Sequence, residues 1–87
     1  MSKVVVELRI GDYAKWRSVF DKNKPLRDSA GFKNIRIYRY SDDANDIVLL
    51  GETSDMRKLR KALTAPQLRT AMQEAGVVGQ PMVHVIR

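Results

Sequence analysis

The order of the predicted secondary-structure elements is the feature that most restricts the fold of this chain. Alternating apolar residues predict strands over residues 3–10, 34–40, 46–53 and 82–86, and helical spacing predicts a helical stretch after the first strand and another after the third. This βαββαβ order spans all 87 residues and is that of the ferredoxin-like fold. We therefore expect residues 1–87 to form a single α+β domain, a ferredoxin-like sandwich in which helices cover one face of a four-stranded antiparallel sheet.

Local signals mark the ends of the helical stretches. Asp12 is suited to cap the first helix, because its carboxylate can accept hydrogen bonds from free amides of the first turn. Gly31 suits the left-handed position that ends this stretch. Thr64 and Gln67 have the spacing of a capping box just where Pro66 interrupts the second stretch, so we expect a new helix to start there.

The length and composition of the chain limit its chemistry. A chain of 87 residues buries only about 60–65% of its unfolded surface, so association with a second copy would add to a marginal core. There is no cysteine, and His84 is the single histidine, so we expect no metal and no cofactor. The first apolar run is soon interrupted by Glu7 and Arg9, which makes it too short for a secretory or membrane-spanning segment. We expect a cytoplasmic protein that has no membrane partner.

The face of the sheet that the helices leave uncovered decides whether the protein associates. Two helical stretches can cover one face only, and a mixture of large apolar and charged side chains on the other face is typical of a sheet that packs against a second sheet. We therefore expect a homodimer through this face, with Glu7, Arg36 and Glu52 as paired charges in the interface. A shift of the last strand by one residue would exchange its two faces. The residues expected on the uncovered face are Val5, Glu7, Arg9, Arg36, Tyr38, Val48, Leu50, Glu52, Met82, His84 and Ile86.

Four groups of residues along the chain are similar to a known family. They are Asp12, Tyr13, Trp16 and Phe20; Arg27 and Gly31; Tyr38, Arg39, Asp42, Asp43 and Asn45; and Pro66, Leu68, Arg69, Met72, Ala75, Gly76 and Val77. In these positions the chain resembles the small dimeric α/β-barrel proteins related to antibiotic biosynthesis monooxygenases. The resemblance implies a ferredoxin-like protomer whose sheet packs face to face with that of a second copy, and a cavity near the sheet and the long helix.

The activities in this superfamily are diverse. They include cofactor-free monooxygenation of polyketide quinones, haem degradation and isomerisation. The haem-degrading members use an Asn, Trp and His constellation. The chain has Trp16 and His84 but no Asn in the first strand, which argues against haem chemistry.

Five residues are candidates for a ligand site. Trp16 and Phe20 would wall a cavity between helix and sheet, although both are equally suited to be core anchors. Arg36, Tyr38 and His84 could supply polar contacts. His84 is also the weak candidate for a catalytic residue, as a general base or a donor to an enolate oxygen, with a structural histidine as the alternative interpretation.

Three functions are compatible with these residues. The first is a homodimeric protein that binds a small apolar or aromatic molecule, and the second is a cofactor-independent monooxygenase or cyclase-like enzyme acting on an aromatic polyketide-type substrate. A nucleic-acid-binding module is a distant third, suggested by the net charge of +6. RNA-recognition domains of this topology place stacking aromatic residues on the first and third strands, and this chain has none there, so we expect no specific nucleic-acid partner.

Overall fold

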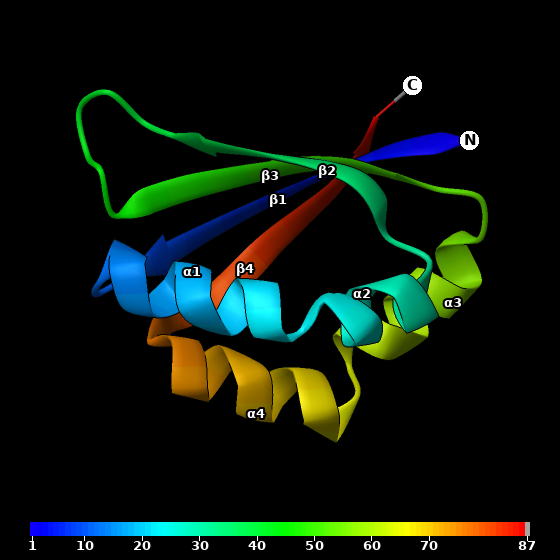
Figure 1. Ribbon diagram of the computed structural model, residues 1–87. Coiled ribbons are helices and arrows are strands. Elements are labelled where there is room, and N and C mark those ends of the chain that lie inside the picture. The colour runs from blue at the N-terminus through cyan, green and yellow to red at the C-terminus, as the bar shows by residue number, and fades with distance from the viewer. Residues whose placement is uncertain (87) are drawn as a thin grey trace.

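The computed structural model describes residues 1–86, in which a four-stranded antiparallel sheet has all its helices on one side (Figure 1). The strands lie in the order β2-β3-β1-β4, so β1 and β3 are central and β2 and β4 are the edges. The predicted ferredoxin-like α+β fold is confirmed, with each helical stretch divided into two helices. Along the chain the elements are β1 (Ser2–Ile10), α1 (Tyr13–Lys22), α2 (Lys24–Ala30), β2 (Lys33–Arg39), β3 (Asp46–Thr53), α3 (Met56–Leu63), α4 (Pro66–Ala75) and β4 (Val77–Ile86).

The ends of the first helical stretch follow the local signals. The Asp12 carboxylate accepts hydrogen bonds from the backbone N–H groups of Ala14 and Lys15, which fixes the start of α1. Gly31 ends α2 at φ 75°, a left-handed conformation that glycine adopts without a steric penalty. Both predictions are confirmed.

The predicted capping box at the start of α4 is wrong. Ala65 occupies the N-cap position and provides no side-chain hydrogen bond. The Thr64 hydroxyl instead donates to the carbonyl oxygens of Arg60 and Lys61, 3.5 and 3.0 Å away, at the end of α3. The helix restarts because Pro66, which lacks an N–H, is tolerated in the first turn of α4, where the amide would have no helical partner.

The last strand is longer than predicted. It starts at Val77 rather than at residue 82, and Gly79 within it adopts φ 71° where the pairing with β1 shifts register between Glu7 and Arg9. Glycine and proline there therefore mark an irregularity inside a strand rather than the approach to one.

The core lies between the helices and one face of the sheet. Trp16 of α1 is 3% exposed and packs against the apolar face of the central strands. Gly51 of β3 makes room for Phe32, because a Cβ atom at this position would lie 2.3 Å from the Phe32 ring. The buried core residues are Val4, Val6, Leu8, Ile10, Trp16, Ala30, Phe32, Ile47, Leu49, Leu59 and Ala75.

The helices leave part of their own face of the sheet uncovered. Val83 and Val85 pair with Val6 and Val4 and so lie on the helix-facing side, yet they are 37% and 42% exposed. Among residues 1–86, no helix is long and apolar enough to cross a membrane.

Candidate functional site

The strand register fixes which side chains share the face that has no helices, uppermost in Figure 1 and called the open face below. Residues that pair directly across neighbouring strands lie on the same face of a sheet. From β4 through β1 and β3 to β2, the first row holds Ile86, Lys3, Glu52 and Lys33; the second, His84, Val5, Leu50 and Arg36; the third, Met82, Glu7, Val48 and Tyr38; and the fourth, on three strands, Val78, Arg9 and Asp46.

This register confirms the predicted composition of the open face, including the assignment of the last strand. Val48 and Leu50 are half-buried within the sheet, whereas Met82 and Ile86 are 53% and 42% exposed. Apolar side chains thus stand on every strand except β2, which contributes Tyr38. A contiguous apolar surface of this kind is typical of an interaction site.

Aromatic residues of α1 form a stack on the opposite, helix-covered side. The ring centroid of Trp16 lies 5.8 Å from that of Tyr13 and 4.9 Å from that of Phe20. The Arg27 guanidinium lies 3.6 Å from the Phe20 ring centroid, and Arg27 also donates to the Phe20 carbonyl oxygen. Burial lowers the pKa of Arg27. The stack joins α1 to α2 as part of the core.

The five candidate ligand residues divide into two groups on opposite sides of the sheet. Trp16 and Phe20 belong to the stack on the helix side. Arg36, Tyr38 and His84 lie on the open face, with Arg36 and His84 in the same row but on opposite edge strands. Three strand spacings separate those two, roughly 14 Å. One copy of the chain therefore does not bring the five residues together.

A hollow of about 590 Å³ opens beside the irregular part of β2, and we call it the bulge hollow. Between Lys33 and Arg36 the strand has one residue more than its partner β3 has between Glu52 and Leu50, which is a β-bulge. Its lining includes Lys3, Asn34, Ile35, Arg36, Leu50 and Glu52.

The bulge hollow combines an apolar floor with a net positive rim. Leu50 is half-buried beneath it, and Lys3 and Arg36 outnumber the single carboxylate of Glu52 in the lining. Its volume falls within the range of about 300–1,000 Å³ that is usual for small-molecule sites.

A second hollow, of about 570 Å³, lies where the end of α1 meets α4. Lys22 and Glu74 are its charged residues, and the rest of the lining is small or uncharged. Neither hollow is lined by Trp16, Phe20 or the remaining open-face candidates Tyr38 and His84.

Two polar contacts organise the other end of the open face. The Tyr40 hydroxyl donates a hydrogen bond to Glu7, which raises the pKa of Tyr40. Arg9 forms an ion pair with Asp43 at 2.7 Å. The pKa of Asp43 is lowered, chiefly by the hydrogen bond from the Asn45 N–H and further by Arg9. Glu7, expected as a charge paired across the interface, already has a partner within the chain.

Asn34 lines the bulge hollow but is not among the candidate residues that the sequence pattern indicated. It is the one residue other than glycine among residues 1–86 that adopts a positive φ, at 54°. Asparagine tolerates this left-handed conformation better than most residues, but a single Asn at the start of a strand carries no distinctive pattern. Non-glycine residues in this conformation concentrate at functional sites.

Metal binding has no support in the described part of the chain, where no cluster of three or more His, Asp or Glu residues occurs. The open face of β1 and β3, both wholly described, presents Val5, Glu7, Val48 and Leu50 and no aromatic residue on which a base could stack.

Comparison with known proteins identifies the fold. No protein-family model and no curated protein matches the chain. Among solved structures, a candidate antibiotic biosynthesis monooxygenase from Bordetella bronchiseptica is similar with a TM-score of 0.79 and 11% identity, over 99% of this chain and 94% of that one. SnoaB, a cofactor-independent oxygenase from Streptomyces nogalater, has a TM-score of 0.72 and 21% identity over 99% and 92%.

A third structure extends the same pattern. A candidate antibiotic biosynthesis monooxygenase from Caulobacter crescentus has a TM-score of 0.73 and 15% identity, over 98% of this chain and 86% of that one. The chain therefore has the ferredoxin-like fold of antibiotic biosynthesis monooxygenase-like proteins along nearly its whole length, as the resemblance implied. At these identities the likeness identifies the architecture, and function has to be argued from the site.

Proposed function

We propose that residues 1–87 form one domain of a cytoplasmic homodimer that binds a small apolar or aromatic molecule. The observation that carries the proposal is the open face, where Val5, Val48 and Leu50 stand in the centre of a sheet side that has no covering layer. A second copy packed face to face would remove this apolar area from water. The bulge hollow lies on the same face and would become enclosed by the second copy.

Light scattering coupled to gel filtration tests the dimer. We expect twice the chain mass at micromolar concentration for the natural protein and the single-chain mass for Val48→Asp, since the substitution places a charge at the centre of the face. Ala14→Asp is the matched control, because Ala14 is exposed on α1, on the other side of the sheet. A natural protein of single-chain mass that does not change with concentration would contradict the proposal.

A second candidate function is a cofactor-independent monooxygenase or cyclase-like activity on an aromatic polyketide-type substrate. The observation that favours it is the similarity to SnoaB together with two basic side chains on the open face, Arg36 and His84. A guanidinium can stabilise an enolate oxygen, and an imidazole can accept the proton that leaves the substrate.

Oxygen uptake tests this activity. Anthrone, which forms a stabilised carbanion, would consume one O₂ to give anthraquinone and water. We expect uptake above the uncatalysed rate for the natural protein and less for Arg36→Gln. Uptake no faster than in buffer would remove the enzymatic candidate and leave the binding function to be tested on its own.

A further inference from the structure

We propose that the bulge hollow is a binding site for a small organic anion with an apolar ring, and that β4 of a second copy completes it. The inference rests on the proposed homodimer and names the place and the chemical class of its ligand. Three properties of the open face support it: the pattern of charge along the rows, the strained bulge, and the excess of cations over an apolar floor.

The charges on the central strands favour one arrangement of the two sheets. If the two-fold axis runs along the strands between β1 and β3, each row faces itself in reverse. Lys3 then faces Glu52 of the second copy, and Arg9 faces Asp46 of the second copy. If the axis runs across the strands, Lys3 faces Arg9 and the two carboxylates face each other. Since like charges brought together in an interface are costly, the first arrangement is favoured.

This arrangement places β4 of the second copy over the bulge hollow. β4 and β2 are the two edges of the sheet, so reversal of the rows brings one over the other. Arg36 then faces His84 of the second copy, and Lys33 faces Ile86 of the second copy. Packed sheets lie about 10 Å apart, which leaves room for a flat ligand where the bulge withdraws side chains from the surface.

The bulge itself is a costly feature of β2. Asn34 is held at φ 54°, and its strand loses regular pairing with β3 between Lys33 and Arg36. Strain of this kind costs about 1–3 kcal/mol and persists where the surroundings impose it, frequently at binding sites. Here the strained segment forms one wall of the hollow.

The residues around the hollow define the ligand class. Glu52 lies between Lys3 and Lys33 in the first row, so its charge is compensated by two lysines. Arg36 stands in the next row above Leu50 and has no ion-pair partner within residues 1–86. A ring lying on Leu50 with a carboxylate or enolate oxygen at the Arg36 guanidinium would satisfy both groups.

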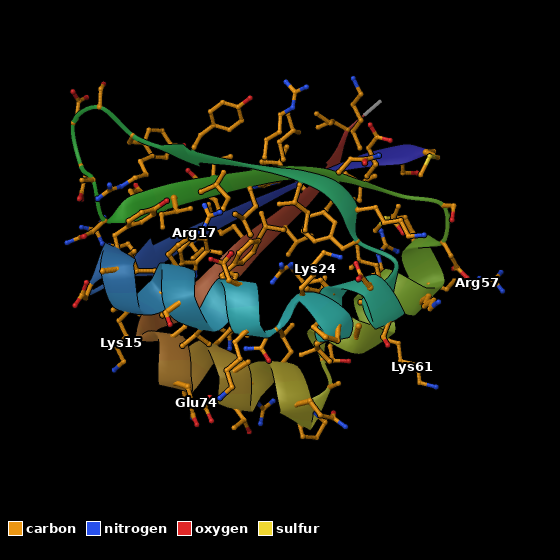
Figure 2. The ribbon with its side chains drawn as sticks, in the orientation of Figure 1. Lys15, Arg17, Lys24, Arg57, Lys61 and Glu74 are labelled. Carbon is orange, nitrogen blue, oxygen red and sulfur yellow. The ribbon has the colours of Figure 1, made fainter. Side chains whose placement is uncertain are left out.

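Calorimetric titration of the full chain with 2-naphthoate tests the ligand class. We expect Arg36→Gln to weaken 2-naphthoate binding by about tenfold, the value of one charge-assisted hydrogen bond. Binding of neutral 2-naphthalenemethanol should change little. Arg57→Gln is the control with the same loss of charge, because Arg57 projects from α3 away from the sheet in Figure 2. Equal effects of the two substitutions, or no binding of 2-naphthoate, would overturn the inference.

Mixed dimers test the contribution of the second copy. In a dimer of one Arg36→Gln chain and one His84→Ala chain, purified through two different tags, one site keeps both native residues if Arg36 and His84 come from different copies. We expect such dimers to bind 2-naphthoate at one site per dimer with native affinity, while each homodimeric variant binds weakly. Failure of the mixed dimer to recover binding would overturn the shared site.

The mass of the protein separates this inference from the proposed function. Arg36-dependent binding of 2-naphthoate by a protein of single-chain mass would contradict the dimer, and with it the shared site, but support the hollow as an anion site. A dimer that binds neither probe would support the proposed assembly and contradict the inference.

Discussion

Tyr40 donates a hydrogen bond to Glu7 across the open face, although the two residues belong to the end of β2 and to the central strand β1. The bond gives the carboxylate a partner on a face that is otherwise apolar beside it, since Glu7 is flanked by Met82 and Val48 in its row. A charge can be covered at lower cost when it keeps a hydrogen bond.

Loss of the Tyr40 hydroxyl is expected to weaken the dimer. In Tyr40→Phe the Glu7 carboxylate would enter the interface without its donor, so the variant should dissociate at higher protein concentration than the natural chain does. Light scattering over a dilution series measures this shift. Tyr38→Phe is the matched control, because the Tyr38 hydroxyl has no hydrogen-bond partner within residues 1–86. Equal dissociation of the two variants would contradict a role for the Tyr40 bond.

Trp16→Ala is expected to destabilise the protein by about 3–5 kcal/mol. The indole is 3% exposed and stacked between Tyr13 and Phe20, so truncation leaves a large cavity in the core. Urea denaturation measures the loss. If the variant does not fold, Trp16→Phe, which retains one ring of the stack, should fold with a smaller loss. A loss below about 1 kcal/mol for Trp16→Ala would place the side chain outside the core.

Gly51→Ala is expected to cost about 1–3 kcal/mol, as overpacking does. The added Cβ would lie 2.3 Å from the Phe32 ring, which is buried and cannot move aside. Gly11→Ala is the control, because a Cβ there meets nothing within 4 Å. Urea denaturation compares the two, and Phe32→Leu should recover part of the loss in the Gly51→Ala background. Similar stability of both glycine variants would contradict the close contact.

The ion pair of Arg9 with Asp43 is expected to add a pH dependence to stability. The pKa of Asp43 lies below its usual 3.8, so the folded state favours the carboxylate. Its contribution is fully present above that pH and is lost as pH falls through the folded-state pKa. Thermal denaturation should therefore place Asp43→Asn below the natural chain near neutral pH, with the difference vanishing in acid. A difference that persists at the lowest pH would contradict this origin.

Local signals in the sequence predicted the parts of the fold that depend on one or two neighbouring residues. Asp12 and Gly31 act as predicted because a cap needs only its own turn of helix. Thr64 did not cap α4, because its hydroxyl found the free carbonyl groups at the end of α3 first. A spacing pattern does not decide which of two adjacent helices receives a shared residue.

The grouping of the candidate site residues depended on long-range geometry that the sequence does not contain. Alternation predicted correctly that Arg36, Tyr38 and His84 share a face. Trp16 and Phe20 were grouped with them on chemical character, and the structure places those two on the other side of the sheet. The bulge at Asn34 creates the hollow, and one inserted residue in a strand has no periodic signature.

The pairing of β4 with β1 has a consequence for the order of folding. Val4 pairs with Val85, so this contact closes a loop of almost the entire chain, and loop closure of that length is entropically costly. The β2–β3 hairpin, whose partners are close in sequence, can form before it. Until β4 arrives, β1 remains an unprotected edge of valines, a surface on which unfinished chains can pair with one another. Refolding should consequently become less efficient as protein concentration rises, even though the finished sheet keeps β1 enclosed.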